Sequence, residues 1–226
     1  QLWVPSKWQK ECTVNQGYDE SKIRVVPEGV DVNTFNPNVN KSSHPILSED
    51  RFTFFLAGRW DYRKSTKEII KSFINTFGKS EPVDLIVSVD NPFSNDNLNS
   101  TEERLEHYGL SDDRIKILHF PPRDEYISLL KNCNVFVSCS RSEGWNLPLI
   151  ESMSCGTPSI YSNCSGQLEF AEGKGIPINI LGEKPVNESD YNHFNESVGN
   201  YYEPDFNHLS KQMREVYNNY PHYKSK

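Results

Sequence analysis

The sequence predicts an α/β domain built on a doubly wound parallel sheet, and three observations lead to this prediction. Short apolar runs typical of buried strands recur at 52–57 (FTFFLA), 83–89 (VDLIVSV), 115–118 and 135–139. Segments with helical apolar spacing or helix-capping residues stand between these runs. Regular alternation of strand and helix is typical of parallel sheets whose crossovers are helices. We therefore expect one Rossmann-like domain over residues 1–226.

The first fifty residues are expected to lead into this sheet. Residues 1–5, which contain the strand-like run LWVP, are expected to form the end of a connection between domains. Ser6 is placed to cap a helix over 7–16. A short strand at 23–26 and a polar linker at 38–50 follow. This part of the chain is therefore expected to contribute little to the central sheet.

The loop after the strand at 52–57 carries two cations, Arg59 and Lys64. The next residues, Ser65 and Glu68, have the spacing of a capping box, which predicts a helix start. An arginine and a lysine five residues apart can converge on one diphosphate, the arginine through its fork and the lysine as a point charge. Each cation taken alone could equally be a solvated loop charge.

A second capping box is formed by Ser100 and Glu103, ahead of a helix that Gly109 is expected to end. Both boxes rest on the same local signal, a serine followed three residues later by glutamate. The sequence therefore predicts the same side-chain cap at both helix starts.

Residues 135–162 (VFVSCSRSEGWNLPLIESMSCGTPSIYS) form the stretch around which the chain is organised. The pattern predicts a strand, a tight loop, a short helix with Pro148 in its first turn, and a second strand from 159. Gly156 is expected to end the helix. In a parallel sheet such a loop lies at the carboxyl ends of the strands, where ligands bind.

This loop has the features of an anion site. Two carboxylates flank it, Glu143 in the loop and Glu151 in the helix. Free backbone N–H groups at a helix N-terminus attract anions, helped by the helix dipole. The N–H groups expected to serve here belong to Gly144, Trp145, Asn146 and Leu147.

The last fifty residues are expected to be less regular. Residues 173–202 are rich in Gly, Asn and Pro and predict an irregular excursion. A terminal helix is predicted over 205–220, with Leu209, Met213 and Val216 on its apolar face.

Composition narrows the class of protein. The net charge of −7 argues against nucleic acid or an anionic membrane as the main partner. No apolar run approaches the roughly 20 residues of a membrane span. Five cysteines without CxxC spacing favour a reducing, cytoplasmic setting over a disulfide or zinc framework. Because the first residue is not Met, we expect the chain to be a fragment.

The setting of the two glutamates, SEGWNLPLIESMSCGTPSI, resembles the paired-glutamate motif of retaining nucleotide-sugar glycosyltransferases with the GT-B fold, the glycosyl transferases group 1 type. The passage KIRVVPEGVDVNTF at 22–35 is similar to the one that leads into their donor-binding domain. Arg59 and Lys64 match the cations that hold the donor phosphates in that family. The chain departs from the family pattern at Ser65 and Asn146, where relatives have Gly.

The resemblance implies the C-terminal, donor-binding half of a two-domain GT-B enzyme. It implies that Arg59 and Lys64 stabilise the leaving diphosphate. Glu143 would accept hydrogen bonds from sugar hydroxyls and Glu151 from the ribose. The nucleobase would lie near His119, which is not expected to act as a base. The family retains anomeric configuration without a protein nucleophile, so Arg59, Lys64 and Glu143 are the expected catalytic groups.

The expected reaction is transfer of a hexose from a UDP- or GDP-linked sugar to a glycan or a lipid-linked saccharide, in polysaccharide biosynthesis. No metal and no other cofactor are expected. The resemblance implies an N-terminal GT-B domain in the full protein, so this domain alone would be inactive or weakly active. A non-catalytic nucleotide-binding module or donor-binding fragment remains the alternative, and a protein-interaction domain is a third class.

A glycoside hydrolase would need the two carboxyl groups to face each other across a sugar. One loop glutamate and one helix glutamate beside an anion-binding turn serve that chemistry poorly. The base, the sugar, the acceptor, the linkage and the oligomeric state are left open by the sequence.

Overall fold

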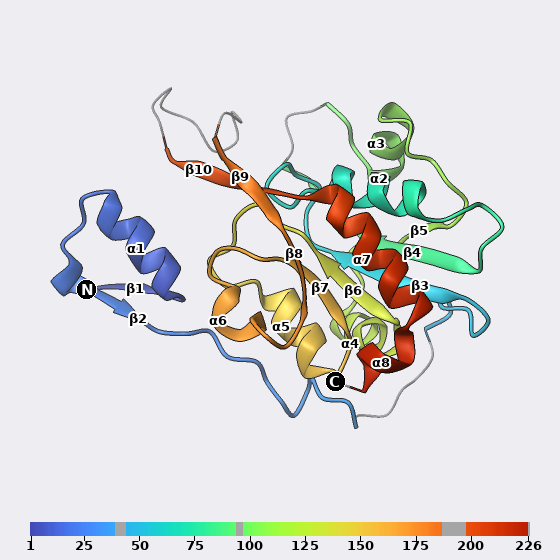
Figure 1. Cartoon of the computed structure of the whole chain (residues 1–226), viewed down its shortest axis with the longest axis horizontal. Helices are drawn as coiled ribbons and strands as arrows, with labels where there is room; N and C mark the ends of the chain where they lie inside the picture. Colours follow the sequence, from blue (N-terminus) through green and yellow to red (C-terminus); the bar gives the residue numbers. More distant parts are fainter. Residues whose placement is uncertain (39–43, 94–96, 187–197, 226) are drawn as a thin grey trace.

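A six-stranded parallel sheet forms the centre of the protein (Figure 1). This computed structural model describes residues 1–38, 44–93, 97–186 and 198–225. The strand order is β5-β4-β3-β6-β7-β8, with every neighbouring pair parallel. The strands are β3 (Phe52–Ala57), β4 (Val83–Ser88), β5 (Ile115–Ile117), β6 (Val135–Ser138), β7 (Ser159–Ser162) and β8 (Ile176–Ile178). The predicted fold class, a doubly wound parallel α/β sheet, is confirmed.

The chain runs outward from β3 to β5 and then crosses back to start a second half at β6. The direction of winding therefore changes between β3 and β6, which are neighbours in the middle of the sheet. In open parallel sheets, the crevice outside the carboxyl ends of the strands at such a switch point is where ligands bind. The loops that follow β3 and β6 are therefore the first place to look for a site.

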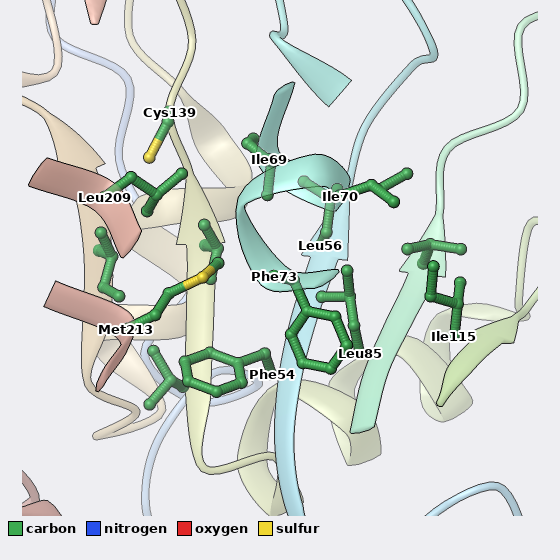
Figure 2. Packing of buried hydrophobic residues seen from close by; sticks show 14 of the residues in the cluster. Phe54, Leu56, Ile69, Ile70, Phe73, Leu85, Ile115, Cys139, Leu209 and Met213 are labelled. Carbon is green, nitrogen blue, oxygen red and sulfur yellow. The ribbon is translucent and has the colours of Figure 1, made fainter. Parts of the chain in front are cut away.

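Helices cover both faces of the sheet (Figure 1). They are α2 (Thr66–Thr76), α3 (Thr101–His107), α4 (Arg123–Asn132), α5 (Leu147–Ser154), α6 (Leu168–Ala171), α7 (Phe206–Asn218) and α8 (Tyr220–Lys224). Successive strand residues point to opposite faces, so Phe54 belongs to the core beneath α2 and α7, whereas Phe55 belongs to the core beneath α4 and α5. Figure 2 shows Phe54 beside Phe73 of α2 and Met213 of α7.

A separate unit precedes the sheet. β1 (Leu2–Val4) and β2 (Ile23–Val25) pair in parallel, with α1 (Lys7–Asn15) between them in the chain. The hydroxyl of Ser6 accepts from the N–H of Gln9, which confirms the predicted cap. The strand-like run predicted within residues 1–5 is confirmed as β1, and β2 supplies its backbone partners.

The prediction of an irregular segment at 173–202 is wrong for much of its described part. β8 lies within it, and β9 (Ile180–Pro185) pairs with β10 (Asn200–Pro204) as an antiparallel hairpin. The sequence signal was missing because β9 is mostly exposed and shows no apolar alternation. Residues 187–197 lie outside the described residues.

The terminal helix lies where it was predicted. Helix α7 falls within 205–220, and the side chain of Asp205 caps it by accepting from the N–H groups of Asn207 and His208. Leu209, Met213 and Val216 are its buried residues, so the predicted apolar face is confirmed.

Candidate active site at the carboxyl edge of the sheet

Two loops meet at the switch point, the β3–α2 loop and the β6–α5 loop. Lys64 Nζ lies 2.6 Å from Glu143 Oε1, and Arg63 Nη1 lies 3.1 Å from the same oxygen. Arg63 also donates to the carbonyl of Ser142 at 2.7 Å. We call Arg63, Lys64 and Glu143 the rim cluster. Two of its members are residues that the sequence predicted to act together, although they are far apart in the chain.

Glu143 is buried, with 8% of its surface exposed. Burial raises the pKa of its carboxyl group, but the charges of Lys64 and Arg63 outweigh this effect and hold the pKa below the usual value. Its backbone is fixed from the opposite loop, since its N–H donates to Ser165 Oγ at 3.1 Å and its carbonyl accepts from Gly166 at 3.0 Å. Glu143 is therefore a fixed carboxylate at neutral pH.

Arg59 lies in the same loop and is the most solvent-accessible of its cations. Its side chain is 42% exposed, and its Nε lies 3.8 Å from Asp61 Oδ2. The other oxygen of that carboxylate accepts from the N–H of Lys64 at 2.6 Å. Asp61 therefore links Arg59 to the loop segment that presents Lys64. The contact is a loose one, so the arginine fork remains accessible to a ligand.

The stem of Lys64 passes over Gly58. A Cβ added to Gly58 would lie 3.7 Å from Lys64 Cε, and the φ of Gly58 is +148°. Only glycine adopts this φ without strain. Gly58 therefore sets the sharp exit from β3 that brings Lys64 to the rim cluster.

The capping box predicted at Ser65 and Glu68 does not form. Ser65 has a left-handed φ of 56° and makes no side-chain cap. Its hydroxyl accepts instead from Arg141 Nη1 at 2.8 Å, and Arg141 also donates to the carbonyl of Tyr62 at 2.6 Å. The buried guanidinium of Arg141 therefore fixes the β3–α2 loop from across the site.

Sequence reasoning missed Arg63 and Arg141. A signal for Arg63 was present, because it directly precedes Lys64 in the chain. No local signal marks Arg141, whose partners lie in distant segments. Its role became visible only in the folded protein.

The backbone of the β6–α5 loop keeps its donors free. No described group accepts a hydrogen bond from the N–H groups of residues 144–147. These N–H groups belong to the first residue of α5 and to the three residues before it. As predicted, α5 carries Pro in its first turn. A Cβ added to Gly144 would lie 2.7 Å from Gln9 Oε1 of α1, so any other residue here would displace the end of the Gln9 side chain. The loop therefore has the donors of an anion site.

The side chains of Trp145 and Asn146 point away from this anion site into the protein. Trp145 is buried, and its ring centroid lies 5.1 Å from that of Phe170. Asn146 Nδ2 donates to Ser138 Oγ at 3.0 Å and to Gln167 Oε1 at 2.6 Å. The amide nitrogen of Asn146 therefore holds the loop to its neighbours. Leu147 is 43% exposed.

Glu151 faces α4. Its Oε2 accepts from the phenol of Tyr126 at 2.8 Å, and burial raises the pKa of the Glu151 carboxyl group. Burial likewise raises the pKa of the Tyr126 phenol, so the phenol stays protonated and donates. The contacts of Glu151 thus lead to α4 and not to the rim cluster, although both lie in one strand–loop–helix unit.

His119 follows β5 at the same edge of the sheet. Its Nδ1 lies 2.6 Å from Asp90 Oδ2, and its Nε2 lies 3.0 Å from Glu102 Oε1. The hydrogen bond that the imidazole donates to the Asp90 carboxylate raises the pKa of the imidazole. The ring therefore joins the ends of β4 and β5 to α3, which is a positioning role.

Metal-binding side-chain groups and membrane-spanning helices are two further features that would bear on the class of protein. No group of three or more His, Cys, Asp or Glu side chains within the described ranges is placed to hold a metal ion. None of the helices in the described part of the chain combines the length and apolar character needed to cross a bilayer.

The fold and the position of the site define a Rossmann-like domain. Its switch point carries cations and a helix N-terminus with free N–H donors, which together suit the phosphates of a nucleotide. The family described as glycosyl transferases group 1 matches residues 39–178, and the chain belongs to this family. The resemblance found in the sequence is thereby confirmed.

Two relatives indicate how much of such a protein the chain represents. It is 28% identical over 184 residues to D-inositol 3-phosphate glycosyltransferase of Paenarthrobacter aurescens (strain TC1), covering 80% of this chain and 44% of the relative. It is 32% identical over 167 residues to UDP-Gal:alpha-D-GlcNAc-diphosphoundecaprenol alpha-1,3-galactosyltransferase of Escherichia coli, covering 70% and 41%. The chain thus spans about two fifths of the length of these relatives.

Solved structures share the fold. The structure of Anabaena HepE in complex with UDP and glucose superposes with a TM-score of 0.73 at 15% identity, covering 98% of this chain and 55% of that one. Sucrose-phosphate synthase from Thermosynechococcus elongatus superposes with a TM-score of 0.71 at 21% identity, covering 98% and 50%. The chain therefore has the fold of one half of a GT-B glycosyltransferase.

Proposed function

We propose that this chain is the donor-binding domain of a retaining glycosyltransferase that takes a hexose from a UDP- or GDP-linked sugar. The observation that carries the proposal is the convergence of Lys64 and Arg63 on Glu143 at the switch point, beside the free N–H groups of residues 144–147. Membership in the glycosyl transferases group 1 family supports the reaction class.

The charge balance of the site favours a diphosphate. The rim cluster holds two cations and one carboxylate, and the exposed Arg59 lies in the same loop. The negative charges of a diphosphate would be balanced by this excess of positive charge. Glu143, the buried carboxylate, would keep its pairing with the cations. Lys64, Arg59 and the loop N–H groups would then stabilise the negative charge that develops as the diphosphate leaves.

The two glutamates have separate roles in this proposal. Glu143, ionised at neutral pH, accepts hydrogen bonds from sugar hydroxyls, and Glu151 accepts from the ribose after exchanging its contact with Tyr126. No protein nucleophile is required, because the leaving phosphate can accept the proton of the acceptor hydroxyl on the same face of the sugar. The reaction needs no metal in this mechanism, since the cations and N–H groups supply the charge stabilisation.

The acceptor would be a glycan or a lipid-linked saccharide, and the process polysaccharide biosynthesis. The Escherichia coli relative is named for a UDP-linked donor and a diphosphoundecaprenol-linked acceptor, which supports this choice. An N-terminal domain would complete the enzyme, because the chain spans about two fifths of its relatives. All five cysteines are free thiols, which favours the reducing cytoplasm.

Isothermal titration calorimetry with UDP and GDP tests the donor site. Arg59→Ala and Glu151→Ala should each weaken nucleotide binding by about 1–3 kcal/mol, the range for loss of a hydrogen bond to a charged group. Arg24→Ala, which removes an exposed arginine of β2, is the matched control and should leave the affinity unchanged. Unchanged affinity in both site variants would remove the site assignment.

The short span of the chain also favours a second candidate, a donor-binding fragment that transfers nothing by itself. A donor-hydrolysis assay with UDP-glucose and GDP-mannose separates the two. Slow release of the sugar by the wild type, lost in Lys64→Ala, supports the transferase. Nucleotide binding without any release supports the fragment.

A further inference from the structure

A cavity lies beside the rim cluster, and most of its lining residues belong to parts of the chain outside the matched residues 39–178. The β9–β10 hairpin extends beyond the carboxyl edge of the sheet toward α1 (Figure 1). Between them is a cavity of about 620 Å³. Its walls come from α1, from the hairpin, and from Arg63 and Ser142 of the two site loops.

The hairpin is fixed to the site by a network around Glu203. One oxygen of Glu203 lies 2.9 Å from Arg141 Nε and accepts from the phenol of Tyr62 at 3.1 Å; the other lies 2.8 Å from Lys184 Nζ. The N–H of Tyr202 donates to the carbonyl of Arg141 at 3.1 Å. Arg141 is also the residue that fixes the β3–α2 loop, so the hairpin and the rim cluster are held in one arrangement.

Helix α1 forms the other wall of the cavity and is bonded to the hairpin. Trp8 Nε1 donates to the phenol oxygen of Tyr202 at 3.2 Å, and the ring centroids are 6.4 Å apart. This bond fixes the edge of the indole, and both Trp8 and Tyr202 line the cavity. An aromatic face with a fixed polar edge offers an apolar surface and a hydrogen-bonding group together.

The lining chemistry selects a neutral ligand. Among the described lining residues, the charged groups are the carboxylates of Glu11 and Glu183 and the guanidinium of Arg63. Arg63 is already paired with Glu143, so the cavity has more negative than positive charge available to a ligand. The two carboxylates accept hydrogen bonds from neutral hydroxyl groups, whereas their charge would repel a phosphate. Asn200 Nδ2 donates to Glu183 Oε2 at 3.1 Å, which holds this carboxylate in place.

We propose that this cavity binds the neutral saccharide end of the acceptor, with Trp8 and Tyr202 against the sugar and Glu183 and Glu11 accepting from its hydroxyls. The inference rests on the proposed function, because Arg63, which lines the cavity, is also a member of the rim cluster at the proposed donor site. It assigns acceptor recognition to the hairpin of this chain, and it selects an uncharged sugar over a phosphorylated one.

Ligand-observed NMR on the full chain tests this site. The probes are maltose, lactose and N,N′-diacetylchitobiose, each free and as the octyl glycoside, with glucose 6-phosphate as the charged probe. At least one neutral probe should bind, and glucose 6-phosphate should bind at least tenfold more weakly. Trp8→Ala and Glu183→Gln should each weaken binding of the neutral probe at least tenfold. Tyr18→Ala, an exposed aromatic of the same unit outside the cavity, is the matched control.

The outcomes separate the two proposals. Absence of binding by every neutral probe, or affinity unchanged in both Trp8→Ala and Glu183→Gln, overturns the acceptor site. Glu183→Gln preserves size and therefore controls for misfolding in Trp8→Ala. Failure of the wild type to bind UDP and GDP would reject the proposed function instead. If the free sugar and its octyl glycoside bind equally well, the site recognises the sugar alone. If the octyl glycoside binds more tightly, the site also contacts the lipid carrier. Both outcomes support the acceptor site.

Discussion

Arginine–carboxylate pairs lie at both the amino ends and the carboxyl ends of the parallel strands, which we call the amino edge and the carboxyl edge. The two edges differ in how many hydrogen-bond donors are left without an acceptor among the described residues. At the amino edge, Arg114 donates to both oxygens of Asp112 at 2.8 Å each. Its remaining nitrogen donates to the carbonyls of Phe77 and Gly78, also at 2.8 Å. Arg51 with Asp84 and Arg214 with Glu81 form similar pairs at this edge, each also binding a backbone carbonyl.

At the carboxyl edge, the balance is different. Lys64 and Arg63 share one oxygen of Glu143, and the N–H groups of residues 144–147 have no described acceptor. The Arg114–Asp112 pair is therefore complete without a ligand, although Asp84 Oδ1 at the same edge is buried without a partner in the described part of the chain. The carboxyl edge differs in having N–H donors left over. The comparison teaches that spare capacity distinguishes a binding site from structural ion pairs.

The largest effect is expected at the amino edge. Arg114→Ala leaves Asp112 buried without its partner, which should lower the free energy of unfolding by about 3–5 kcal/mol. Urea unfolding followed by circular dichroism measures this change. Arg24→Ala, an exposed arginine, should change it little. If Arg114→Ala also abolished nucleotide binding by the folded protein, the distinction between the two edges would be wrong.

A smaller effect, on binding instead of folding, is expected at the carboxyl edge. Lys64→Ala removes a charged donor and should weaken UDP or GDP binding by about 1.5–3 kcal/mol, measured by calorimetry. Lys71→Ala, an exposed lysine on the following helix, is the matched control. Equal affinity in the two variants would show that Lys64 serves folding like the arginines of the amino edge.

The smallest effect concerns pH. Because the pKa of Glu143 is held below its usual value of 4.5 in the folded protein, the carboxylate stabilises the fold above that pH. This contribution is lost as the pH falls through the lowered value. The difference in free energy of unfolding between wild type and Glu143→Gln should therefore be largest near neutral pH and shrink below pH 4.5. A difference that grows on acidification would contradict the pairing with Lys64 and Arg63.

Much of the fold was predictable because its signals are local. The apolar runs at 52–57 and 83–89 predicted β3 and β4, since strands buried on both faces need continuous apolar residues. The β9–β10 hairpin was not predictable in this way, because its strands are stabilised by pairing with each other and by the network around Glu203.

The two serines of the predicted capping boxes show where sequence information ends. Ser100 accepts from the N–H of Glu103 at 3.2 Å, as its local sequence determines. Ser65 has the same motif, yet its hydroxyl accepts from Arg141, which lies in the loop after β6. The sequence by itself determined the order of strands and helices from β3 to β7, and the positions of Arg59, Lys64 and Glu143 in loops of one edge. Only the tertiary structure decided that Arg63 and Arg141 join the site, because hydrogen bonds to buried charges from distant segments override a local cap.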